Sequence, residues 1–98
     1  MTPVERYHQA LREIGCVACI IQHGAPSWPV AIHHLFDAHE RNEYLTAPLC
    51  EPGHHQHGKG ADIFPFHPGG ERRFRAVNGF GEKELLAETI KQYARRRA

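Results

Sequence analysis

The chain has 98 residues, the length of one small domain, so we treat residues 1–98 as a single domain. Its 12 Lys and Arg residues nearly balance 11 Asp and Glu, and a formal net charge of +1 excludes a strongly basic nucleic-acid binder of the usual kind. No apolar run approaches 18 residues and residues 1–14 are polar and charged, so we expect no membrane partner and no signal peptide.

The first predicted element is a helix over residues 3–14. Thr2 and Glu5 have the spacing of a capping box, in which each side chain bonds to the other residue's backbone. Val4, Tyr7, Leu11 and Ile14 then recur at helical spacing, and Gly15 ends the pattern.

The middle of the chain is divided into short pieces by proline and glycine. Residues 16–21 are apolar and rich in β-branched side chains, which suits either a strand or a metal-binding knuckle. Residues 28–35 are predicted to form a strand, and residues 37–46 a polar loop. We expect His54 and His55 to open a short helix, and residues 59–70 to form a Gly/Pro-rich loop.

Two helices are predicted near the end of the chain. Residues 71–77 suit one or two helical turns with Phe74 and Val77 facing inward. Residues 82–95 contain good helix formers and one apolar stripe, which consists of Leu85, Leu86, Ile90 and Tyr93. The fold class we expect is therefore α+β, with a small core over about residues 14–70 flanked by an N-terminal and a C-terminal helix.

Three cysteines and one histidine have the spacing of a structural zinc site. Cys16 and Cys19 can reach one ion from a single tight turn, Cys50 can add a third thiolate, and His54 can complete a tetrahedral shell. Two alternatives stay open, namely a redox pair at Cys16 and Cys19, or three plain buried cysteines. The odd cysteine count argues against a disulfide framework and favours a reducing, cytoplasmic location.

Nine histidines are the strongest anomaly of the composition. Neutral imidazole is the commonest metal ligand and a general base near neutral pH. His33 and His34 are neighbours on a predicted strand, so their side chains point to opposite faces. One can bind a metal while the other accepts a proton from water, as phosphodiester hydrolysis requires. The alternative is that the two are ordinary surface residues or satisfied core residues.

The order of these motifs resembles the HNH endonuclease family. The motifs are Cys16-x2-Cys19, Ile32-His33-His34, Pro48-Leu49-Cys50 and His54-His55. More narrowly, Phe66-His67 and the ending Phe80-Gly81-Glu82 with Glu84-Leu85-Leu86 are similar to phage and prophage HNH proteins of the recombination-enhancement type, which act with RecA filaments.

The resemblance implies a ββα-metal fold stapled by a zinc knuckle, and a role for each histidine. His33, His55 and His67 would bind the catalytic ion, with His57 as a less favoured third ligand. His34 would be the general base. The catalytic ion would be Mg²⁺, Mn²⁺, Zn²⁺ or Ni²⁺, DNA the substrate, and a RecA-type filament the partner.

The sequence therefore favours a metal-dependent DNA endonuclease. Arg72, Arg73 and Arg75 follow the histidines and are the candidates for contact with the substrate backbone. Two other hypotheses remain, a non-catalytic zinc module that binds nucleic acid or protein, and a redox or metal-handling protein.

Overall fold

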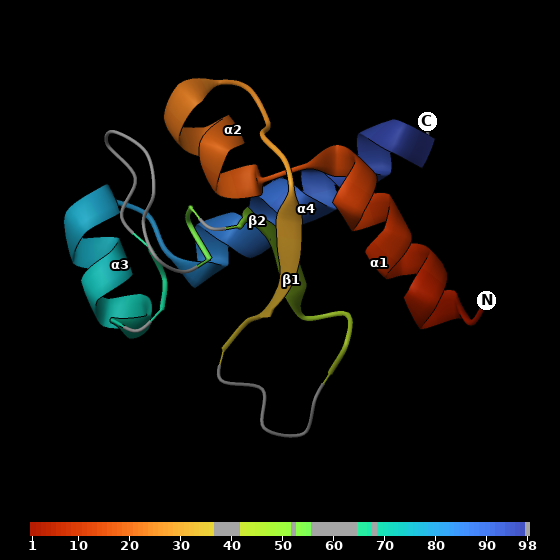
Figure 1. Ribbon diagram of the computed structural model, residues 1–98, viewed down its shortest axis with the longest axis horizontal. Helices are drawn as coiled ribbons and strands as arrows, with labels where there is room; N and C mark the ends of the chain where they lie inside the picture. The colour runs from red at the N-terminus through yellow and green to blue at the C-terminus, as the bar shows by residue number, and fades with distance from the viewer. Residues whose placement is uncertain (37–41, 52, 56–64, 68, 98) are drawn as a thin grey trace.

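A computed structural model of the protein describes residues 1–36, 42–51, 53–55, 65–67 and 69–97 (Figure 1). Its elements, in chain order, are α1 (Pro3–Ile14), α2 (Val17–His23), β1 (Val30–His34), β2 (Thr46–Cys50), α3 (Gly70–Asn78) and α4 (Glu82–Arg97). The expected α+β class is confirmed. Within the described ranges no helix is long and apolar enough to cross a membrane.

The two strands form a small antiparallel sheet at the centre of the molecule. Val30 pairs with Cys50 at one end and His34 with Thr46 at the other. Helices α1, α2 and α4 all contact the sheet, and Figure 1 shows α3 on the side remote from α1. Every residue of β2 is buried, so β2 is the inner strand against which the helices pack.

Local signals explain the helix boundaries. The Thr2 hydroxyl accepts the Glu5 amide, and the Glu5 carboxylate accepts the Thr2 amide, so the predicted capping box forms. At the end of α2, Gly24 adopts a left-handed conformation with φ of 80°. The buried core joins all these elements and includes Leu11, Leu35, Leu49, Phe74 and Leu85, each with no exposed surface.

Some element predictions are wrong. Of the two alternatives for residues 16–21, the strand does not form: Cys16 caps α2, and the helix buries Val17, Ala18 and Cys19 despite its β-branched residues. Packing against β2 and α4 outweighs the weak local preference.

The expected loop over residues 37–46 ends too late, because Thr46 already belongs to β2. Pro48 within that strand obscured it. A proline is tolerated here because each strand of a two-stranded sheet is an edge strand. The described part of the expected helix start, residues 53–55, is a turn instead.

Two apolar residues predicted to face inward are exposed. Val77 on α3 is 59% exposed and Ile90 on α4 is 55% exposed. Both lie on helices that contact the rest of the protein along a narrower stripe than the sequence pattern suggested, formed by residues such as Phe74 and Leu85.

Gly15 should be a sensitive position for stability. Its φ is 91°, and an added Cβ would lie 2.8 Å from both Pro26 Cβ and Trp28 Cε2. We expect Gly15→Ala to reduce the free energy of unfolding by about 2–4 kcal/mol, through backbone strain and overpacking, as measured by urea denaturation. Gly24→Ala is the matched control, because its φ is 80° but an added Cβ would meet nothing within 4 Å. Equal losses in the two variants would contradict the packing argument.

Candidate functional site

The four candidate zinc ligands meet between α2 and the end of β2. Cys16 is the N-cap of α2 and Cys19 lies in its first turn. Cys50 is the last residue of β2, and the turn that follows places His54 beside it, with the His54 amide donating to Cys50 Sγ at 3.1 Å. All four side chains are buried, and their ligand atoms lie within 4.8 Å of one another.

The distances in this Cys3His group fit one tetrahedral ion. His54 Nδ1 lies 3.5, 3.4 and 3.3 Å from the sulfurs of Cys16, Cys19 and Cys50, and the Cys19 and Cys50 sulfurs are 3.9 Å apart. Zinc–sulfur bonds of about 2.3 Å and zinc–nitrogen bonds of about 2.0 Å set donor separations of about 3.5–3.8 Å in a tetrahedron. The group can therefore bind a metal such as zinc.

The protonation of this group also suits a cation. Contact with Cys16 lowers the pKa of Cys50 and of Cys19, while the same contacts raise the pKa of Cys16. Burial opposes protonation of His54, but its hydrogen bonds to Cys50 and Cys19 and the charges of these two residues together outweigh burial and raise the pKa of His54. Without a cation, the Cys16 thiol and His54 thus tend to keep their protons, which a metal would displace on binding.

Two further side chains support the Cys3His group. His54 Nε2 donates to Gln22 Oε1 at 2.7 Å, which leaves Nδ1 free to face the sulfurs. The Ser27 hydroxyl donates to Cys19 Sγ at 3.0 Å. Such outer contacts orient metal ligands and fix their tautomers.

A second group of three histidines lies on the other side of the same turn. Ligand atoms of His33, His55 and His67 lie within 4.8 Å of one another. The ring centroids are 5.6 Å apart for His33 and His55, 5.2 Å for His33 and His67, and 5.1 Å for His55 and His67. The structure therefore brings together the three histidines that the sequence analysis grouped.

Backbone pairing positions the histidines of this second group. The amides of Phe66 and His67 donate to the carbonyls of His54 and His55, so this segment runs beside the turn. The Phe66 ring packs against His33 with centroids 4.2 Å apart. His57, the alternative third ligand, lies outside the described residues.

His33 has the character of a ligand. Burial, then the neighbouring His67 and His55, lower the pKa of His33 to about 3, which keeps its imidazole neutral. Its Nε2 atom is buried and has no hydrogen-bond partner among the described residues. Because a buried polar atom without a partner costs about 1–3 kcal/mol, the pocket suits a cation that would accept this lone pair.

His34, the expected general base, is half-exposed beside these histidines. Its Nε2 lies 3.1 Å from Glu43 Oε1. A carboxylate can only accept, so His34 donates from Nε2 and keeps Nδ1 as an acceptor. A hollow of about 340 Å³ is lined by His33, His34 and His67, together with Phe66, Gly70, Glu71 and Glu82.

The three expected arginines all lie on α3 but differ in their contacts. Arg75 donates to Glu71 at 2.8 Å and lies 3.1 Å from Glu84, so carboxylates of the protein already engage its guanidinium. Arg72 and Arg73 are exposed on the same helix.

Three supporting residues were not identified from the sequence. Glu43 contacts His34, Glu51 accepts from His55 Nδ1 at 2.7 Å, and Gln22 holds His54. The four-residue spacing of Glu51 and His55 was a usable signal. No sequence pattern pointed to Glu43 or Gln22, because Glu43 lies 9 residues from His34 and Gln22 lies 32 residues from His54.

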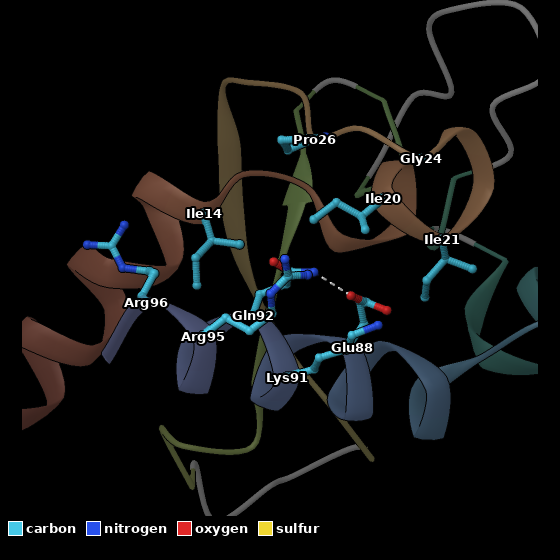
Figure 2. A pocket seen from close by; sticks show the side chains of 10 residues that line it. All are labelled: Ile14, Ile20, Ile21, Gly24, Pro26, Glu88, Lys91, Gln92, Arg95 and Arg96. Atoms are coloured by element: carbon cyan, nitrogen blue, oxygen red, sulfur yellow. Dashed lines mark hydrogen bonds between the residues drawn. The ribbon is translucent and has the colours of Figure 1, made fainter. Parts of the chain in front are cut away.

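A larger hollow of the described surface, about 660 Å³, lies elsewhere. Figure 2 shows it between α4 and a wall made by the end of α1, α2 and Pro26. None of the clustered histidines or cysteines lines it. We therefore place the chemistry in the smaller hollow beside His33 and His34.

Fold and site together define a small α+β protein with a buried Cys3His group that can bind zinc. The protein belongs to the family described as recombination enhancement, RecA-dependent nuclease, whose model matches residues 2–94. No curated protein and no solved structure matched the chain. The family indicates a nuclease that acts in recombination, and hence DNA as substrate.

Proposed function

We propose that this protein is an HNH-type, metal-dependent DNA endonuclease that hydrolyses phosphodiester bonds with His34 as general base. The main support is the convergence of His33, His55 and His67 on one small volume, with the buried His33 Nε2 unpartnered among the described residues. The proposal also takes residues 1–98 as one nuclease domain, with phage or prophage recombination as its setting.

In this proposal the two metal sites have separate tasks. Cys16, Cys19, Cys50 and His54 would hold a structural zinc ion. His33, His55 and His67 would hold a catalytic ion, which can be Mg²⁺, Mn²⁺, Zn²⁺ or Ni²⁺. When bound, that ion supplies positive charge to the phosphate and the leaving oxygen.

The residues of the chain would perform the proton transfer and the positioning. His34 Nδ1 accepts a proton from the attacking water, whose oxygen bonds to phosphorus as the phosphorus–oxygen bond to the leaving nucleotide breaks. Glu43 holds the imidazole through Nε2. Arg72, Arg73 and Arg75, which all lie on α3, would contact the substrate backbone, with the Arg75 guanidinium held by Glu71.

The family name also favours a partner. A nuclease described as RecA-dependent is expected to cut DNA that a RecA-type filament holds or exposes. With a net charge of only +1, this chain has little long-range attraction for DNA of its own. A filament that delivers the DNA would overcome that weakness.

The test is cleavage of labelled DNA, with and without a RecA filament, over a titration of Mg²⁺ or Mn²⁺. We expect wild-type cleavage to need the divalent ion. Glu51→Ala should need about 10–100-fold more ion for half-maximal rate, since it removes the acceptor that orients His55. Glu51→Gln retains an acceptor oxygen and should lose less.

Glu13→Ala is the matched control, because Glu13 is an exposed carboxylate paired with Arg96 rather than with a histidine. It should leave the titration unchanged. A wild-type protein that cuts no DNA under any of these conditions would refute the nuclease. An unchanged metal requirement in Glu51→Ala would remove His55 from the ligand set.

A further inference from the structure

We infer that Phe36 is a stacking site for an unpaired nucleobase next to the bond that is cut. The inference rests on the proposed nuclease function. It identifies which group of the substrate binds beside His34. Neither the family description nor the histidine group specifies that group.

The backbone of Phe36 is in an uncommon conformation. Its φ is 59°, and among the described residues it is the only one other than glycine with a positive φ. A bulky side chain in this region costs about 1–2 kcal/mol. Such strain persists only where the surroundings hold it, and it is concentrated at functional sites.

The Phe36 backbone is held in this conformation by residues that line the candidate active site. The Phe36 amide donates to Glu82 Oε2, and the Glu82 amide in turn donates to Glu71 Oε2 at 2.8 Å. Glu82 is only 8% exposed. Both carboxylate residues line the hollow that His33 and His34 also line, so the unusual backbone is tied directly to that hollow.

The Phe36 side chain stands on the exposed side of the strand end. Leu35 has no exposed surface, whereas His34 and Phe36 on either side of it are both exposed. Phe36 follows His34 by only two residues, and its amide is held by Glu82, which lines the same hollow as His34. A large apolar ring is thus held at the solvent beside the proposed general base.

No ring of another described residue packs against Phe36. Tyr44, a similarly exposed aromatic of the β1–β2 connection, differs because its ring packs against Tyr7 with centroids 5.3 Å apart. Every nucleobase has an aromatic face, and stacking one base on an aromatic side chain contributes about 1–3 kcal/mol. A nucleobase is therefore the substrate group that this ring fits.

The experiment is a cycle that combines Phe36→Ala with a single abasic nucleotide in a single-stranded DNA oligonucleotide. The abasic position is moved through the nucleotides flanking the mapped cut. At one position, we expect the variant alone and the abasic site alone each to lower kcat/KM by about 5–100-fold, with little further loss in combination. Phe36→Trp should retain most of the activity, and Tyr44→Ala is the control that should retain wild-type activity.

Binding separates this inference from the nuclease proposal. In the His34→Ala background, Phe36→Ala should lower affinity for the intact oligonucleotide, as measured by fluorescence anisotropy, by a similar factor. The stacking site would be overturned if the effects of Phe36→Ala and of the abasic site on kcat/KM were independent at every abasic position. A Phe36→Ala protein with wild-type affinity and rate would overturn it too. Wild-type protein that binds through Phe36 but never cuts would refute the nuclease alone.

Discussion

Cys50→Ser is expected to leave the chain unfolded at neutral pH, because it removes one ligand of the buried Cys3His group that is proposed to bind zinc. Closed structural zinc sites contribute on the order of 10 kcal/mol to folding, which is comparable with the whole stability of a small domain. The buried core of this protein is small and includes the three cysteines themselves. The measurement is far-UV circular dichroism together with zinc content by elemental analysis.

The wild-type protein should retain one zinc ion per chain after dialysis and should unfold when a strong chelator removes it. His67→Ala is the informative control, since His67 is exposed and belongs to the other histidine group. It should keep both the zinc and the fold. Cys50→Ser that folds and binds zinc as tightly as the wild type would show that the Cys3His group does not stabilise the protein.

His34→Ala is expected to reduce kcat for DNA cleavage by about 10²–10⁴-fold without loss of fold. General-base catalysis accelerates a reaction by about this factor. The His34 side chain is 42% exposed and bonds to Glu43, so its removal leaves no cavity in the core. KM should change little, because the imidazole is proposed to act on water rather than to bind DNA. Steady-state kinetics and a thermal unfolding curve test both parts.

His23→Ala is the matched control for His34→Ala. His23 is an exposed histidine at the end of α2 and belongs to neither ligand group. It should cut DNA at the wild-type rate. Full activity in His34→Ala would show that His34 is not the general base. A loss of activity that is explained by a lower melting temperature would assign His34 a structural role instead.

Local signals predicted the helices well because each boundary is set within a few residues. The Thr2 and Glu5 capping box and the stop at Gly15 define α1, and the run of good helix formers after Gly81 defines α4. By contrast, α2 and β2 depend on packing. The short run from Val17 becomes helical by contact with β2 and α4, and Pro48 hides a strand whose every residue is buried.

The two ligand groups were predictable because metal coordination restricts residue type and spacing. The structure brings together the ligand sets grouped from the sequence, Cys16 with Cys19, Cys50 and His54, and His33 with His55 and His67. Two of the residues that orient the histidines, Glu43 and Gln22, were not predictable. Glu43 and Gln22 reach their histidines only through the tertiary fold, and one carboxylate or amide among many carries no signal in sequence.

One short turn links the two ligand groups, since His54 and His55 are consecutive residues that serve different groups. The Cys50 carbonyl accepts the amides of both Gly53 and His55, which makes this link tight. The position of His55 therefore depends on how the neighbouring Cys50 and His54 are held. Under the proposed function, a newly made chain without zinc would therefore lack an ordered position for His55, and DNA cleavage would begin only after the Cys3His group had bound its metal.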